Sequence, residues 1–237
     1  MLSSSVRDFI LYCSENKVIS FNTDSGFVLK SGRIAPWYFN AGNLMQHAEW
    51  LSKIAKIFVH TLRENFSDEN GKLKADILYG AAYKWIPLAA VVAQEYYLQT
   101  GYNIGYSSHR KESKWHGSDA GRGFWMSTAW KKCIILDDVV SAGTAFRNAV
   151  SDIETDGGNV VGFVFLIDRE EVTWWAEVPS PWEKRISAIT AAREEHDIPV
   201  IGSFTYSQIR TAVEEWLIGD VTVGQALDSY NEKYGIW

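Results

Sequence analysis

Cysteine is scarce in this chain of 237 residues, which contains only Cys13 and Cys133. Cys133 lies in a strongly apolar segment, and two cysteines cannot form the disulfide framework of a small secreted protein. No apolar run near the start is long enough for a signal peptide or a membrane span. We therefore expect a cytoplasmic setting.

Positive charge is also in short supply, because 23 Lys and Arg face 29 Asp and Glu, for a formal net charge of −6. A protein that binds nucleic acid needs a basic face. We therefore expect neither nucleic acid nor a membrane as a partner. Hydrophobic residues make up 46% of the chain and charged residues 22%, which indicates a globular protein with a sizeable core.

Apolar runs typical of buried strands alternate along the chain with amphipathic patterns typical of helices. This alternation predicts an α/β fold with a mostly parallel central sheet and helices on both faces. The expected strands are 76–80, 102–107, 133–136, 160–167 and 200–205. The expected helices include 48–66, 86–100, 208–217, 223–234 and one that a capping box at 180–183 opens and that ends near 196.

Two local signals precede this alternation. Ser5, with Asp8 three residues later, predicts the N-cap of a first helix. The segment from Phe27 to Asn40 predicts a short hairpin, in which Phe27–Lys30 pairs with Trp37–Asn40 across a Ser-Gly-Arg turn.

The segment from Cys133 to Ala145 is the most informative part of the chain. Its apolar start predicts a buried strand, and the carboxylates of Asp137 and Asp138 come where that strand ends. Small residues then allow a tight turn, and a helical pattern follows that stops at Gly157. N–H groups and the helix dipole converge in such a loop, which suits a phosphate group. The carboxylates could bind a sugar's vicinal hydroxyls or hydrated Mg²⁺, or could simply be solvated.

Three other stretches carry candidate chemistry. Tyr83 and Lys84 follow the strand 76–80 at the rim where open α/β sheets bind ligands, although Lys84 alone could be a surface lysine. The segment 109–117 is rich in Lys, Arg and His, which predicts either a mobile basic loop directed at a phosphate or a solvated face. Arg169 follows the strand 160–167 and could pair with a ligand's carboxylate or with Glu170 or Glu171.

Together these motifs resemble those of the orotate phosphoribosyltransferases, a branch of the type I phosphoribosyltransferases. The segment 133–145 matches the phosphoribosyl-pyrophosphate (PRPP) motif residue by residue. The Lys-Ser-Gly-Arg of 30–33, the Pro-Trp-Tyr-Phe-Asn of 36–40 and the Asp-Arg of 168–169 select the orotate branch. The resemblance extends from about Phe9 to Thr205.

The resemblance implies a Rossmann-like α/β domain over 1–237 with three parts. These are a small N-terminal hood (1–45), a core (46–205) with a flexible loop at 109–123, and C-terminal helices (206–237). It also implies a homodimer in which the flexible loop of one subunit reaches the active site of its neighbour.

The implied reaction transfers the phosphoribosyl group of PRPP to orotate and gives orotidine 5′-monophosphate and pyrophosphate in UMP biosynthesis. Mg²⁺ would be held mainly by PRPP, with Asp137 and Asp138 as candidate protein ligands. The implied catalytic residues are Lys84, Lys111, Lys114, Asp137 and Asp138. The implied orotate contacts are Lys30, Tyr38, Phe39, Ser141 and Arg169, of which Arg169 takes the carboxylate. The implied PRPP contacts are Lys30, Tyr83, Lys84, Arg110, Lys111, Lys114, His116, Asp137, Asp138, Val139, Val140, Ser141, Ala142, Gly143, Thr144 and Ala145.

Some positions depart from the family pattern, and alternatives remain open. Trp85 stands where glycine is common, and its ring could narrow the site beside Lys84. Ala81, His109 and Trp115 depart as well. A phosphoribosyltransferase for another base is one alternative, although a purine or uracil offers Arg169 no carboxylate. A PRPP-sensing regulator without turnover is the other.

Overall fold

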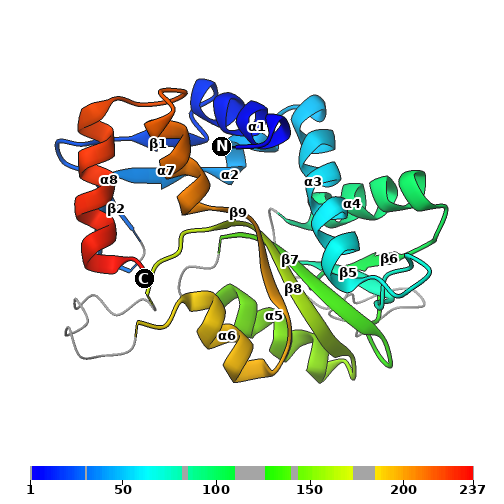
Figure 1. Ribbon diagram of the computed structural model, residues 1–237. Helices are drawn as coiled ribbons and strands as arrows, with labels where there is room; N and C mark the ends of the chain where they lie inside the picture. Colours follow the sequence, from blue (N-terminus) through cyan, green and yellow to red (C-terminus); the bar gives the residue numbers. More distant parts are fainter. Residues whose placement is uncertain are drawn as a thin grey trace.

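The computed structural model describes residues 2–29, 31–81, 85–109, 126–139, 144–172 and 185–236. A five-stranded parallel sheet forms its centre, as the alternating pattern predicted (Figure 1). The strands lie side by side in the order β6-β5-β7-β8-β9. Their bounds are Ile77–Gly80 for β5, Gly105–Ser107 for β6, Lys132–Val139 for β7, Asn159–Asp168 for β8 and Val200–Thr205 for β9.

Helices cover both faces of this sheet, which confirms the predicted fold class (Figure 1). Successive side chains of a strand point to opposite faces. Along β7, Cys133 and Ile135 accordingly join one apolar core, and Ile134 and Leu136 join the other. The first core contains side chains of α5 (Thr144–Thr155) and α6 (Ala188–His196), and the second contains those of α3 (Ala48–Phe66) and α4 (Trp85–Thr100).

The first helix, α1 (Ser4–Glu15), begins earlier than the sequence indicated. Its N-cap is Ser3, whose extended backbone lets Oγ accept a hydrogen bond of 3.4 Å from the Val6 amide. The prediction of Ser5 as the cap is therefore wrong, because Ser5 already lies inside the helix. A capping residue must itself have non-helical dihedral angles.

The hood contains two separate strand pairs instead of the one predicted hairpin. β2 (Phe27–Val28) pairs with β3 (Ile34–Ala35), whereas β4 (Trp37–Phe39) pairs with β1 (Ile19–Phe21). Pro36 separates β3 from β4, and a proline cannot donate to a strand ladder. Its carbonyl instead accepts from Asn22, just past β1, so the chain changes partners at this residue. The short helix α2 (Ala41–Leu44) follows β4.

The C-terminal part of the chain differs from prediction at one point. The helix expected from the capping box at 180–183 begins only at Ala188, because Arg185 to Ser187 are not helical. Ser187 forms an antiparallel bridge to Val172, and its side chain caps the helix at the Thr190 amide, 2.9 Å away. Residues 180–183 themselves lie outside the described residues. The last two helices are α7 (Tyr206–Glu214) and α8 (Val221–Tyr234), as predicted to within about three residues.

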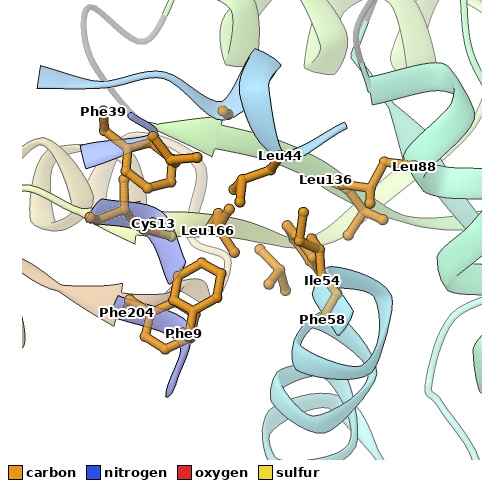
Figure 2. Packing of buried hydrophobic residues seen from close by; sticks show 14 of the residues in the cluster. Phe9, Cys13, Phe39, Leu44, Ile54, Phe58, Leu88, Leu136, Leu166 and Phe204 are labelled. Carbon is orange, nitrogen blue, oxygen red and sulfur yellow. The ribbon is translucent and has the colours of Figure 1, made fainter. Parts of the chain in front are cut away.

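The core on the α3 and α4 side continues into the hood, as Figure 2 shows. Phe9 of α1 stacks on Phe204 of β9 with ring centroids 4.2 Å apart. Cys13, Phe39 and Leu44 join Leu136 and Leu166 of the sheet in the same cluster. The hood is therefore joined to the carboxyl end of the sheet through apolar packing. Within the described residues, no helix is both long and apolar enough to cross a bilayer.

Candidate active site

The strand order identifies one edge of the sheet as the place for a ligand. Counted in chain order, the five strands read 2-1-3-4-5, so the connections leave β5 and β7 in opposite directions. Ligands of open α/β sheets bind at such a switch point, beyond the carboxyl ends of the strands. β5 ends at Gly80 and β7 at Val139. In the sequence, the predicted motifs at 83–84 and 140–143 follow these two strand ends.

Many predicted contacts lie outside the described residues, and their roles stay predictions. They are Lys30, Tyr83, Lys84, Arg110, Lys111, Lys114, His116, Val140, Ser141, Ala142 and Gly143. Thr144 and Ala145 form the start of α5. Because α5 starts at this edge, its N-terminal amides and dipole favour an anion there.

The acidic pair lies at the end of β7, as predicted. In register, Leu136 is beside Gly80 of β5, so the two carboxylates come just past the end of β5. Asp137 is buried and Asp138 is half-buried. The Asp138 amide donates to Asp137 Oδ1 (2.8 Å), and the Val139 amide donates to Asp138 Oδ1 (2.9 Å). Since neighbouring strand residues point to opposite faces, Asp138 is the more accessible acceptor.

Arg169 lies at the same edge of the sheet, two residues past Ile167 of β8, which is in register with Val139 of β7. Its guanidinium lies 3.9 Å above the centre of the buried Trp37 ring. Its Nε and Nη2 atoms are each 2.8 Å from Glu171 Oε1. The ion pair with Glu171, one of the two alternatives for this arginine, is therefore present. The buried side chain of Tyr230 also interacts with the Arg169 guanidinium.

The aromatic pair at 38–39 divides between surface and core. Tyr38 is 42% exposed, and its ring centroid is 5.6 Å from that of Phe27. Phe39 is buried in the cluster of Figure 2. Alternation along β4 places Phe39 on the same inward face as Trp37, and Tyr38 on the exposed face. The expected contacts of both rings with orotate stay predictions.

Trp85 does not narrow the site as the sequence suggested. Its side chain is 3% exposed and belongs to the core, where it faces Phe58 of α3 with ring centroids 6.5 Å apart. The backbone of Trp85 lies close to the end of β5, since a Cβ on Gly80 would overlap the Trp85 carbonyl. The indole itself lies in the core that α3 and α4 form.

Asp168 is an unusual carboxyl group next to Arg169. Burial raises its pKa to about 6, although the Glu170 amide donates to Oδ1 at 2.8 Å. In the unfolded chain the pKa returns to its ordinary value of 3.8. The folded state therefore binds more protons between these values, so this group lowers stability as the pH rises toward 6, and the full penalty persists above that pH.

Replacing Asp168 by asparagine should therefore stabilise the protein more at pH 8 than at pH 5. Asparagine keeps the acceptor for the Glu170 amide but carries no charge to bury. We expect a gain of about 2 kcal/mol at pH 8, since one pKa unit corresponds to about 1.4 kcal/mol. Thermal melts of both proteins at the two pH values measure the difference. A gap that does not change with pH would contradict the raised pKa.

The sequence did not predict the contacts of Trp37 with Arg169 and of Arg33 with Glu171. Trp37 was part of a recognised motif, but its contact beneath Arg169 depends on the pairing of β4 with β1. Arg33 is buried and contacts Glu171, which is distant in the chain. The alternation of Trp37, Tyr38 and Phe39 was the signal that could have identified the inward-facing rings.

The fold and this edge define the class: a doubly wound α/β protein with an acidic pair and a helix start at its switch point. No protein-family model matches the sequence. Orotate phosphoribosyltransferase of Schizosaccharomyces pombe is 34% identical over 222 residues, 93% of each chain. That of Metarhizium anisopliae is 34% identical over 240 residues, 98% of this chain and 97% of its own.

Solved structures agree with these relatives. The crystal structure of Francisella tularensis orotate phosphoribosyltransferase matches with a TM-score of 0.75 and 30% identity, over 96% of this chain and 99% of that one. The Mycobacterium tuberculosis enzyme in complex with PRPP has the same fold, with a TM-score of 0.56 at 15% identity, over 86% of this chain and 98% of that one. The chain belongs to the orotate phosphoribosyltransferase family.

Proposed function

We propose that this enzyme transfers the 5-phosphoribosyl group of PRPP to orotate and releases orotidine 5′-monophosphate and pyrophosphate, as a step in pyrimidine biosynthesis. Membership of the family supports the reaction. The observation that carries the assignment is the placement of Asp137, Asp138 and Arg169 at the adjacent carboxyl ends of β7 and β8. One end of this site has acceptors for ribose hydroxyls and the other has a cation for the orotate carboxylate.

The reaction needs a stabilised leaving group more than a strong base. As pyrophosphate leaves C1 of the ribose, positive charge develops on the sugar, as in glycoside cleavage, and negative charge develops on pyrophosphate. Lys84, Lys111 and Lys114 are the proposed groups that offset the negative charge. Removing one comparable electrostatic contact costs about 10²–10³ in rate. The ring nitrogen of orotate is itself the nucleophile, so no protein nucleophile is required.

Mg²⁺ is the metal that this assignment implies. No cluster of three or more His, Cys, Asp or Glu side chains that could hold a metal occurs among the residues that the structure describes. Asp137 and Asp138 provide the hard oxygen ligands that Mg²⁺ prefers. They fit an ion that takes most of its ligands from the phosphates of PRPP and from water. When bound, the ion would offset charge on pyrophosphate.

A spectrophotometric assay tests the proposed reaction. Purified protein is mixed with PRPP and Mg²⁺, first with orotate and then with uracil or hypoxanthine. We expect consumption of orotate alone. Turnover of another base, or binding of PRPP with no turnover of any base, would overturn the assignment.

We further propose that the enzyme is a homodimer whose loop 109–123 completes the neighbour's site. Two features where the loop leaves and rejoins the sheet support this. Ser107 and Met126 are hydrogen bonded to each other at the edge strand β6. Tyr102, Tyr106 and Met126 expose apolar surface in the same part of the chain, and exposed apolar patches are typical of subunit interfaces.

Mixing two inactive variants tests the shared site. Lys111→Ala should remove the loop's action, and Asp138→Asn should remove ribose binding. In a mixed dimer, one site then combines an intact loop with an intact Asp138. After statistical subunit exchange, we expect about a quarter of wild-type activity, because half of the dimers are mixed and each has one competent site. If subunits exchange and the mixture stays inactive, the loop does not act in trans.

The proposal includes the three parts of the domain and a cytoplasmic setting for the enzyme. We propose that the hood, core and C-terminal helices act as one catalytic unit. Both cysteines are free and buried, which suits the cytoplasmic setting.

A further inference from the structure

Glu171 lies at the centre of a cluster of buried charges. Oε1 contacts Arg169 at 2.8 Å, and Oε2 is 3.4 Å from Nη1 of Arg33. All three side chains are at most 14% exposed. Glu170 is not part of the cluster, because its carboxylate accepts from the amide of Ser207, 2.7 Å away. We propose that Glu171 is the positioning residue that orients Arg169 toward the carboxylate of orotate, an inference that rests on the proposed function.

The contact geometry shows how this positioning works. A guanidinium has two edges that can bind a carboxylate, one formed by Nε and Nη2 and the other by the two Nη atoms. Glu171 occupies the first edge of Arg169, while the ring of Trp37 lies 3.9 Å beneath the guanidinium plane. These contacts lie in different directions and, together with the interaction with the buried Tyr230 side chain, restrict the plane and the rotation of the guanidinium. The orientation of the edge that faces a ligand is therefore set by its neighbours, of which Glu171 is the only charged one among these contacts.

The charges of the cluster favour an anionic ligand. Arg33 and Arg169 carry two positive charges and Glu171 one negative charge, and the neighbouring Asp168, ionised at neutral pH, adds a second negative charge. Buried charges are costly unless they are paired. Glu171 is shared between both arginines, so the carboxylate of orotate would give Arg169 a further ionic partner, whereas a base without a carboxylate would not. Glu171 therefore contributes to base selectivity without touching the base.

The backbone of Glu171 is itself held by the end of the chain. Glu171 forms an antiparallel bridge with Gly235, next to hydrogen bonds from Val172 to the Tyr234 carbonyl (2.8 Å) and from Ile236 to the Glu170 carbonyl (2.9 Å). The segment after α8 thus holds the backbone position from which the Glu171 side chain extends.

The second arginine connects this cluster to the hood. Arg33 lies in the hairpin of β2 and β3, donates to the Val172 carbonyl at 3.3 Å, and lies 4.5 Å from the centre of the Tyr234 ring. A cavity of about 520 Å³ separates residues 22–26 from α8, so close packing does not hold the hood against α8 there. The contacts of Arg33 therefore join the hairpin to Glu171 and to the end of α8.

A charge-conserving substitution separates positioning from net charge. Glu171→Asp keeps the negative charge but withdraws the carboxylate by one methylene, so Arg169 should lose its fixed orientation. We expect the KM for orotate to rise about tenfold, as for a weakened charge-assisted contact, with the KM for PRPP and kcat within about twofold. The matched control is Glu215→Asp, which removes one methylene from the acidic side chain of another ion pair. Glu215, which follows α7, is 2.8 Å from Arg7 of α1.

A double-mutant comparison tests whether the effect passes through Arg169. In an Arg169→Lys background the planar guanidinium is replaced by a single ammonium group, which has no plane to be oriented. Glu171→Asp should then change the KM for orotate by less than about twofold. Equal effects in both backgrounds would show that Glu171 acts independently of Arg169. An unchanged KM for orotate, or equal losses for both substrates together with a lowered melting temperature, would also overturn the inference. If wild-type enzyme does not consume orotate, the proposed function fails first, and this inference fails with it.

Discussion

Replacing Asp138 by asparagine is expected to lower kcat/KM for PRPP about 100-fold, while the melting temperature stays close to that of wild type. Asp138 is half-buried at the end of β7 and is the more accessible member of the acidic pair. A carboxylate that accepts from a ribose hydroxyl makes a charge-assisted bond worth about 1.5–3 kcal/mol. Asparagine can still accept from the Val139 amide, as Asp138 does at 2.9 Å, so the fold should persist.

Two further aspartate-to-asparagine variants serve as comparisons for Asp138→Asn. Asp220→Asn is the matched control, because Asp220 caps α8 through the Val223 amide and asparagine caps a helix equally well. It should leave both activity and stability unchanged. Asp137→Asn alters a buried carboxylate and should change stability as well as turnover. If Asp138→Asn retained wild-type kcat/KM, the acidic pair would have no part in ribose binding.

The parts of the fold that were predictable are those specified by local pattern. The amphipathic spacing of α3 predicted its bounds, Ala48–Phe66, and β9 was predicted over Val200–Thr205. The apolar spacing along α3 and the apolar start of β9 are local features, so a short stretch of sequence is enough to predict each element. The hood was different. Trp37–Phe39 has the composition of a strand, but its partner Ile19–Phe21 precedes the hairpin, and nothing local specifies that choice.

The site shows the same division. The motifs at 133–145 and 168–169 identified the edge of the sheet at which the acidic pair and Arg169 lie. They did not distinguish Tyr38, which is exposed, from Phe39, which is buried. They also left open whether Arg169 pairs with a neighbouring glutamate, because that contact depends on side-chain geometry after β8. The exposure of a side chain and its choice of ion-pair partner depend on tertiary structure, so a sequence motif alone does not specify them.

Replacing Trp85 by alanine is expected to destabilise the protein by about 3–5 kcal/mol, the usual cost of removing a large buried ring. The indole is 3% exposed and lies between α3 and α4, where Phe58 faces it. For a chain of this length such a loss lowers the melting temperature by roughly 10 °C. Thermal and denaturant unfolding measure it. Trp130, which is 95% exposed, provides the matched control, since Trp130→Ala should change stability by less than about 0.5 kcal/mol.

The activity of the same variant decides between two roles for this ring. If the indole only fills the core, Trp85→Ala should keep kcat and both KM values within about threefold of wild type well below its melting temperature, because no ligand contact is lost. If the ring instead bordered the pyrophosphate site, removing it would change the KM for PRPP while stability stayed near that of wild type. The structure favours the first outcome, since the Trp85 carbonyl lies close to Gly80 at the end of β5 while the side chain is buried in the core. The large side chain at position 85 therefore packs in the core, where it stabilises the start of α4.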